Sequence, residues 1–240
     1  MSYTFSVVPG TNTGSSYWDM TYGNNSIYGL QDTKIIKVNG TTAVTINTTL
    51  NTLRTIAVSS TNIYVGKYIS GTGICIYKLD LSGNLISSLS TVAPQSMTLN
   101  DDGSILYFSN DTKIYSVNTS TFNTATQLSF TASGTMPSLR FYQNKLYALC
   151  TAIYAEVFDL SGNIKTTVIN NGTSTAFEGG TVTSNGDWYF SRKNSINTSI
   201  GHFLYQIKLG TPLGVSTTTV DTTPGLNDTE TPLTTFFLIF

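Results

Sequence analysis

Five side chains in this sequence could bind a small polar ligand together, because each stands at or beside the start of a recurring apolar run. An indole ring stacks on a sugar, and a guanidinium, an amide or a carboxylate beside it can hydrogen-bond the sugar hydroxyls. These ligand-binding candidates are Trp18, Asp19, Arg54, Gln95 and Glu178. Alternatively, Arg54 and Glu178 pair with each other and close the site.

Few side chains suit catalysis. Asp19 and Glu178 are the only acids at the first two positions of these runs, and glycoside hydrolysis needs two facing carboxylates. His202 is the only histidine, so a serine–histidine or zinc mechanism would depend on it. We expect His202 to pack or to lie at the surface, and we expect no catalytic residue, no metal site and no cofactor.

The stretch from residue 95 to residue 130 predicts four short β-strands in a row. β-Branched and aromatic residues fill each run, and Gly, Asn, Asp or Ser fill the gaps, where turn dihedrals are needed. The expected strands are 96–99, 105–108, 113–117 and 125–130. A single meander of this kind cannot bury both of its faces, so it requires neighbours of the same kind.

The same pattern recurs along the chain. The opening runs begin, at spacings of 36, 41, 42 and 41 residues, with Trp18, Arg54, Gln95, Pro137 and Glu178. The second strand of each copy carries an aromatic that its repetition assigns to the core: Tyr28, Tyr64, Tyr107, Tyr147 and Tyr189. A period near forty residues with four strands per unit predicts an all-β propeller of about five four-stranded blades, with six as the alternative.

The unit LNDDGSILYFSNDTKIYSVNTSTFNTATQL resembles the YVTN/NHL-type propeller repeat. The run IYVGKY at 63–68 and the identical turns DLSGN at 80–84 and 159–163 fit the same pattern, so the resemblance covers roughly 18–220. It implies the fold and does not imply an activity. The WD-repeat signature and the sialidase-type Asp box are both absent from their usual positions.

We expect one propeller domain over residues 1–220, followed by a separate segment over 221–240. The predicted blades span about 14–50, 51–90, 91–131, 132–172 and 173–220. Residues 1–13 carry a closing strand at 3–8, which either completes the last blade or pairs with 233–240 in an incomplete sixth blade. Closure by terminal strands would remove an open sheet edge.

The last twenty residues divide into a linker, 221–232, and an apolar β-prone run, 233–240. A continuous apolar run implies cover on both faces or burial in a partner. The partner-binding candidates in it are Phe236, Phe237, Leu238, Ile239 and Phe240. They close the protein's own ring or insert into an adjacent subunit.

Cys75 and Cys150 fall on different predicted strands of non-adjacent repeats. A disulfide needs Cα atoms within about 7 Å of each other. We therefore expect two buried free thiols.

Only 10% of the residues are charged and the net charge is −1, whereas roughly 25% are charged in an average soluble protein. The chain therefore lacks an electrostatic footprint for nucleic acid or an anionic membrane. Its polar residues are mostly uncharged, as on many extracellular proteins and virions. We expect no signal peptide and no membrane-spanning segment.

Eight Asn-x-Ser/Thr sequons are glycosylation candidates, although a chain rich in Asn, Ser and Thr also produces them by chance. They are Asn24, Asn39, Asn47, Asn110, Asn118, Asn171, Asn197 and Asn227.

These features predict a non-enzymatic surface or structural interaction module of a virion or an extracellular protein. Its expected partners are proteins, such as other subunits of a larger assembly, or host glycans. The alternative is a propeller-type hydrolase, or a protein that binds a small ligand or sugar at the mouth of a central channel.

Overall fold

The computed structural model describes residues 17–151, 154–170, 177–182, 187–193 and 202–208. These ranges contain strands and turns, and no helix in them is long and apolar enough to cross a membrane. The expected terminal strands, 3–8 and 233–240, lie outside the described residues.

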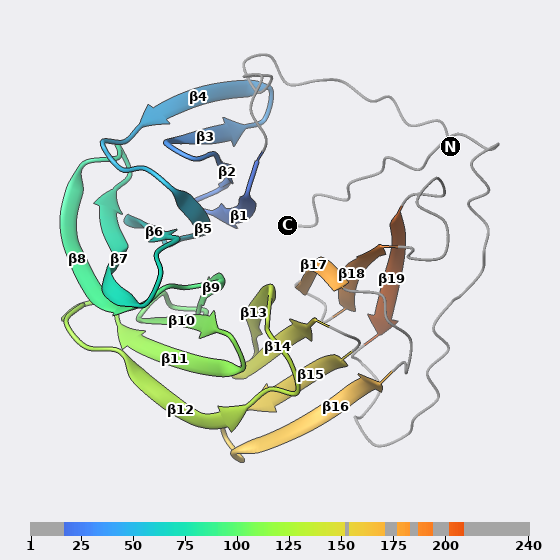
Figure 1. Ribbon diagram of the computed structural model, residues 1–240. Coiled ribbons are helices and arrows are strands. Elements are labelled where there is room, and N and C mark those ends of the chain that lie inside the picture. The colour runs from blue at the N-terminus through green and yellow to red at the C-terminus, as the bar shows by residue number, and fades with distance from the viewer. Residues whose placement is uncertain (1–16, 152–153, 171–176, 183–186, 194–201, 209–240) are drawn as a thin grey trace, which may run out of the picture. The chain divides into compact units, whose positions relative to one another are not determined.

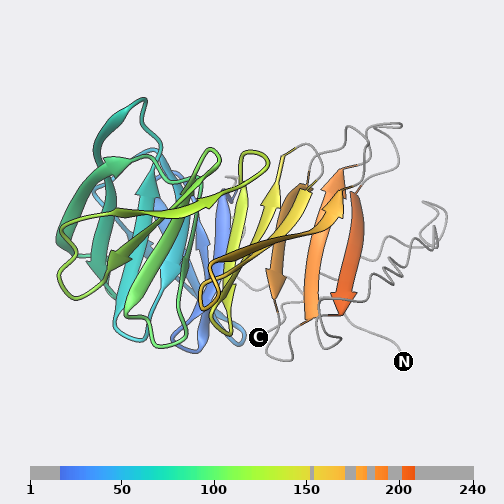
Figure 2. The same ribbon diagram turned by 90° about the horizontal axis from the view of Figure 1, so that it is seen from below.

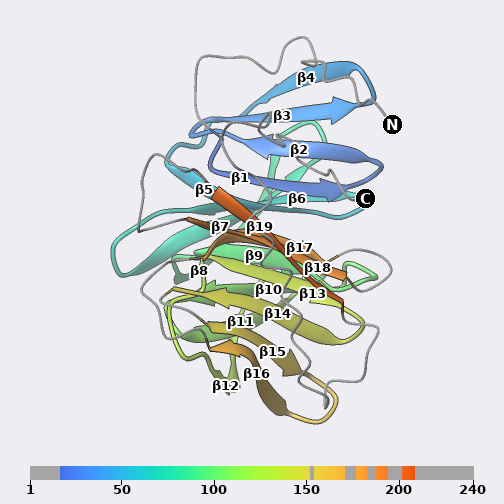
Figure 3. The ribbon, with the colours of Figure 1, turned by 90° about the vertical axis from the view of Figure 1, so that its right-hand side faces the viewer.

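The first three sheets are antiparallel four-stranded meanders, in which strands consecutive in the chain are hydrogen-bonded neighbours. The first sheet contains β1 (Asp19–Gly23), β2 (Ser26–Leu30), β3 (Lys34–Asn39) and β4 (Thr42–Asn47), which lie side by side in this order in Figure 3. The second contains β5 (Leu53–Val58), β6 (Asn62–Lys67), β7 (Thr72–Asp80) and β8 (Leu85–Val92). The third contains β9 (Ser96–Leu99), β10 (Ile105–Asn110), β11 (Lys113–Asn118) and β12 (Thr126–Thr131).

The fourth sheet repeats the meander, and three strands of a fifth are described (Figure 1). The fourth contains β13 (Ser138–Tyr142), β14 (Lys145–Cys150), β15 (Tyr154–Asp159) and β16 (Ile164–Asn170). The fifth contains β17 (Phe177–Val182), β18 (Asp187–Lys193) and β19 (His202–Lys208). The strands within a sheet are twisted (Figure 2), as antiparallel strands of L-residues are.

The described residues belong to two compact units. One holds residues 17–110 and 114–128, and the other holds 111–113 and the described residues from 129 onward. In the first unit β1 lies against β5 and β5 lies against β9, while in the second β13 lies against β17. Within each unit, therefore, the first strands of consecutive sheets are neighbours.

The second-strand tyrosines belong to the core, as their repetition predicts. Tyr28, Tyr64, Tyr107 and Tyr147 are at most 9% exposed. Tyr28 packs in a cluster that joins the first and second sheets, and Tyr64 packs in a cluster that joins the second and third. The side chain of Tyr189, on β18, lies outside the described residues.

The prediction for the two cysteines is also confirmed. Cys75 on β7 and Cys150 on β14 are both buried and both free. The Cys75 thiol donates to the carbonyl oxygens of Thr91 and Val92, at 3.3 and 3.1 Å.

The turn DLSGN at 80–84 docks the second sheet onto β4, the outer strand of the first. Oδ1 of Asp80 accepts the amide of Ser82 at 2.8 Å and the amide of Asn84 at 2.9 Å, which folds the turn. Gly83 has a φ of 92°, and a Cβ placed there would lie 2.5 Å from Cγ2 of Ile46 on β4. The close approach and the positive φ both require glycine.

The second copy of this turn, at 159–163, makes a corresponding contact in the second unit. The hydroxyl of Ser129 on β12 donates to Oδ1 of Asn163 at 2.7 Å. Both copies therefore join a sheet to the outer strand of the sheet before it.

Gly83→Ala should lower the free energy of unfolding by about 2–3 kcal/mol, because the methyl group overlaps Ile46 and the backbone is strained for alanine. Gly71→Ala is the matched control, since Gly71 has a φ of 81° but nothing within 4 Å of its Cβ position. That variant should lose only about 1 kcal/mol. Chemical denaturation measures both, and equal losses would show that the turn does not pack tightly on β4.

Candidate functional site

Trp18 and Arg54 come together in the first unit, at the starts of β1 and β5. The guanidinium carbon of Arg54 lies 3.9 Å from the centroid of the Trp18 ring, a cation–π contact. Nη1 of Arg54 also donates to Oδ1 of Asp32 at 3.0 Å and to the carbonyl of Leu53 at 2.9 Å. Trp18, Asp32 and Arg54 form what we call the Trp18 cluster.

Backbone hydrogen bonds at the end of β2 position this cluster. The amide of Trp18 donates to the carbonyl of Leu30 at 2.8 Å, and the amide of Leu53 donates to the carbonyl of Asp32 at 3.1 Å. Residues 30–32 therefore fix, through two backbone carbonyls, both Trp18 just before β1 and Leu53 at the start of β5.

An exposed row of large side chains extends from the cluster along β1. Trp18, Met20 and Tyr22 are 53%, 47% and 46% exposed, and residues two apart on a strand share a face. Asp19 points the other way: its Oδ2 accepts the hydroxyl of Thr55 at 2.8 Å and the amide of Ile56 at 3.0 Å. Asp19 thus ties the first sheet to the second and leaves the row on the opposite face.

The structure brings together two of the five sequence candidates, Trp18 and Arg54. Gln95 is exposed just before β9, where its amide donates to the carbonyl of Ser109 at 2.8 Å. Glu178 lies on β17 in the second unit, and its side chain is outside the described residues. The pairing of Arg54 with Glu178 is therefore untested, but Arg54 has an acidic partner in Asp32 that the sequence analysis missed.

The Trp18 cluster offers groups that can bind a ligand. An indole edge with a guanidinium against it can stack on a ring and donate hydrogen bonds to oxygen acceptors. In the part of the chain that the structure describes, no three His, Cys, Asp or Glu side chains gather as a metal site would need. His202 begins β19, and nothing further of its side chain is described.

A second polar cluster, in the second unit, surrounds Glu156, which is 0% exposed. The hydroxyl and the amide of Ser133 donate to its two carboxylate oxygens at 2.6 and 3.0 Å, and the hydroxyl of Thr167 donates at 3.2 Å. Nζ of Lys165 lies 3.3 Å from the carboxylate. Nothing in the strand pattern singled out Glu156, because the residues around its carboxylate come from two separate stretches of the chain, Ser133 and β16.

These partners keep the Glu156 carboxylate ionised despite its burial. Burial raises its pKa, but the hydrogen bonds from Ser133 and the charge of Lys165 outweigh burial and hold the pKa below its ordinary value. The neighbouring Cys150 thiol lies 3.6 Å from Oε2 of Glu156. Burial, together with this carboxylate, raises the pKa of Cys150 to about 12, so the thiol is not a nucleophile near neutral pH.

Four of the sequon asparagines are exposed: Asn24, Asn39, Asn47 and Asn118. Asn110 is half-buried, and its Nδ2 donates to the carbonyl of Ala93 at 2.8 Å. The other three, Asn171, Asn197 and Asn227, lie outside the described residues, as do the C-terminal candidates Phe236, Phe237, Leu238, Ile239 and Phe240.

Solved structures with a similar fold support the propeller prediction. A nidogen/laminin complex matches with a TM-score of 0.62 and 13% identity, over 81% of this chain and 76% of that one. Hydrazine synthase from Kuenenia stuttgartiensis matches with a TM-score of 0.61 and 11% identity, over 85% of this chain and 67% of that one.

The extracellular domain of a B. thetaiotaomicron protein described as a one component system matches with a TM-score of 0.57 and 14% identity. This match covers 83% of the present chain but only 27% of the other. No protein-family model and no curated protein matches the sequence. At these identities the likeness shows the fold alone: an all-β propeller, with the four-stranded sheets as four blades.

Glu156→Gln should lower the free energy of unfolding at pH 7 by about 1–3 kcal/mol, because a buried acceptor loses its charge. A depressed folded-state pKa stabilises the protein above the unfolded value, about 4.3, and the contribution disappears as the pH falls through the folded value. The difference in the free energy of unfolding between wild type and Glu156→Gln should therefore become smaller below about pH 4. Urea denaturation over a pH series measures it.

Asp101→Asn, at an exposed carboxylate in the turn before β10, is the control and should leave stability unchanged. A gap between wild type and Glu156→Gln that stays constant down to pH 3 would contradict the assignment.

Proposed function

We propose that this protein is a non-enzymatic interaction module that docks to protein or glycan partners through the Trp18 cluster and the exposed row beside it. The observation that carries the proposal is the Trp18 ring, which is 53% exposed although the Arg54 guanidinium is stacked on it. Aromatic and arginine side chains are the usual centres of binding energy in interfaces.

The composition supports a surface role. With 10% charged residues and a net charge of −1, the chain presents mainly hydroxyl and amide groups. We place it on a virion or on an extracellular surface, where attachment to a host would use proteins or glycans. The exposed sequons at Asn24, Asn39, Asn47 and Asn118 fit a glycosylated exterior.

Two of the similar structures point in the same direction. One was solved as a complex of nidogen with laminin, and another is an extracellular domain. They favour a protein partner, such as other subunits of a larger assembly.

The finer features of the fold belong to the same proposal. We propose a YVTN/NHL-type propeller of five blades over residues 1–220, with the blade limits expected from the repeats and with six blades as the alternative. The fifth sheet has three described strands, β17 to β19. A terminal strand, 3–8 or 233–240, would supply its fourth and protect the edge.

A propeller-type hydrolase is the weaker alternative. It would need Asp19 and Glu178 as facing carboxylates, and Asp19 already accepts hydrogen bonds from Thr55 and Ile56. Its carboxylate acts as a link between sheets, which favours the binding role.

Trp18→Ala should weaken binding to an oligosaccharide array, or to purified proteins of the native assembly, by about 10- to 100-fold. The loss is expected because the ring supplies the stacking surface and also holds the Arg54 guanidinium. Surface plasmon resonance measures the affinity.

Ile86→Ala is the matched control, because Ile86 on β8 is 54% exposed but stands apart from the Trp18 cluster in the sequence. It should bind as wild type does. Equal binding by the Trp18 and Ile86 variants, or no binding by the wild type, would refute the proposed surface.

Deleting residues 233–240 tests the apolar C-terminal segment. If the segment closes the protein's own ring, the deletion should destabilise the monomer, since burying each large apolar side chain contributes roughly 1.5–3 kcal/mol. If the segment inserts into an adjacent subunit, the deletion should leave a folded monomer that no longer assembles. Thermal unfolding and light scattering separate the cases, and no change in either would refute both.

A further inference from the structure

The first and second sheets share a feature that the other sheets lack: a second-strand tyrosine faces a third-strand lysine in register. Tyr28 on β2 lies opposite Lys37 on β3, and Tyr64 on β6 lies opposite Lys78 on β7. Residues opposite each other in a sheet share a face. The two pairs are therefore equivalent, and their surroundings are directly comparable.

In the second sheet the neighbouring turn supplies a hydrogen-bond acceptor for the lysine. Nζ of Lys78 donates to the carbonyl of Thr119 at 2.8 Å, at the β11–β12 turn. Burial raises the pKa of Tyr64, and the neighbouring side chains of Thr119 and Ser59 lower it. Lys78 thus has a hydrogen-bond partner that the same unit provides, and Tyr64 has polar side chains beside it.

In the first sheet these partners are missing. The corresponding turn is the one after β7, and Leu81 stands there where Thr119 stands after β11. Asp80 precedes Leu81, and Asn118 precedes Thr119. The Oδ1 atom of each accepts a hydrogen bond from the backbone amide two residues further on, so the two turns are equivalent. Gly23 takes the place of Ser59.

As a result, the buried hydroxyl of Tyr28, a residue that is 0% exposed, has no hydrogen-bond partner among the described residues. The Lys37 ammonium forms no hydrogen bond or ion pair with them either. Its contact is with the Tyr28 ring, whose centroid lies 5.8 Å from Nζ.

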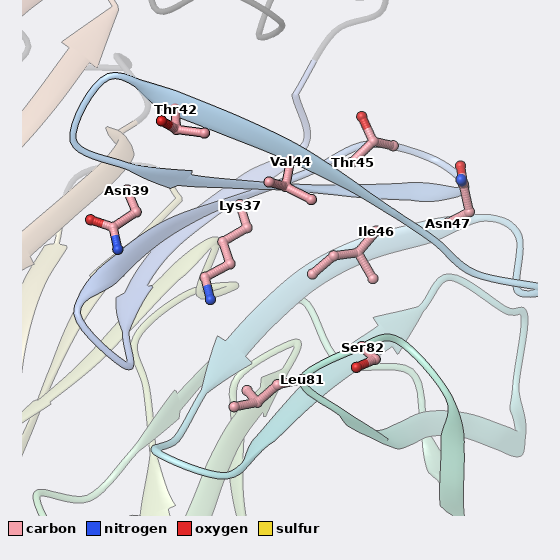
Figure 4. Close-up of a pocket in the computed structure, with 9 residues that line it drawn as sticks. All are labelled: Lys37, Asn39, Thr42, Val44, Thr45, Ile46, Asn47, Leu81 and Ser82. Atoms are coloured by element: carbon pink, nitrogen blue, oxygen red, sulfur yellow. The ribbon is translucent and has the colours of Figure 1, made fainter.

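A pocket of about 860 Å³ is lined by both Lys37 and Leu81. Its walls come from β3, β4 and the β7–β8 turn, and its lining includes Lys37, Asn39, Thr42, Val44, Leu81 and Ser82. Figure 4 shows Lys37 pointing toward the turn that carries Leu81 and Ser82. The volume lies within the range of ordinary small-molecule sites.

We infer that this pocket binds a small sugar carboxylate, with the carboxylate on Lys37 and the sugar hydroxyls on the surrounding amides and hydroxyls. Among the described residues that line the pocket, Lys37 is the single charged one, which matches one carboxylate and is too little for a dianionic phosphate. Asn39, Thr42 and Ser82 offer donors and acceptors for hydroxyls, and Val44 and Leu81 offer apolar surface for the ring carbons.

Asn39 and Asn47, which also line the pocket, are both sequon asparagines. The site is therefore tested on full-length protein made in a bacterial host without N-glycosylation.

Glucuronate is the probe, in an NMR titration that follows the backbone amides. It should shift the signals of Asn39, Val44 and Ser82, with a Kd in the millimolar range. Lys37→Met should raise that Kd at least about tenfold, since the charge-assisted bond is lost. Lys78→Met, the equivalent change in the second sheet, should leave it unchanged.

Val44→Trp provides an independent variant, because Val44 lines the pocket and is 54% exposed, so a large ring there would occupy part of the pocket. It should also abolish the shifts, with an unaltered melting temperature. Glucose and acetate are the ligand controls, and each should bind at least about tenfold more weakly than glucuronate.

Three results would overturn the inference. They are the absence of shifts with glucuronate, equal losses in Lys37→Met and Lys78→Met, and acetate binding as tight as glucuronate binding. None of them bears on the Trp18 cluster, whose residues are absent from the pocket lining.

Discussion

Packing of each sheet against the next is the interaction on which the described structure depends. A four-stranded meander has two faces and too little apolar surface to bury either alone. The buried side chains of Tyr28 and Tyr64 pack in apolar clusters that join neighbouring sheets, so each sheet buries a face against the next. Turns complete the contact, since Gly83 lies against Ile46 at a distance that no larger residue allows.

The same constraint decides which polar groups are structural and which are left for binding. Asp19 accepts hydrogen bonds from Thr55 and Ile56 of the next sheet, so β1 turns its other face, with Trp18, outward. Lys78 reaches the next turn and is satisfied there. Lys37, at the equivalent position in the first sheet, has Leu81 where Lys78 has Thr119, and it lines a pocket. Small differences between repeats therefore create sites within a common scaffold.

Only 10% of the residues are charged, yet one carboxylate, that of Glu156, is fully buried. Among the described acids, Asp32, Asp101, Asp102 and Asp111 are exposed in turns or bends, where water solvates them. Glu156 is buried, and its carboxylate survives there because Ser133, Thr167 and Lys165 replace the water it loses. The cluster ties β15, which carries Glu156, to β16 and to the segment before β13.

The sequence by itself determined the strands, the forty-residue period, the core tyrosines and the two buried thiols. Those features follow from alternation and repetition, which are local and survive without knowledge of distances. Only the tertiary structure decided that Arg54 pairs with Asp32, that Glu156 is buried among donors, and that the Tyr28 hydroxyl has no hydrogen-bond partner among the described residues. Hydrogen bonds and ion pairs of this kind require atoms from distant parts of the chain to lie within about 3 Å of each other. A sequence pattern carries no information about such distances.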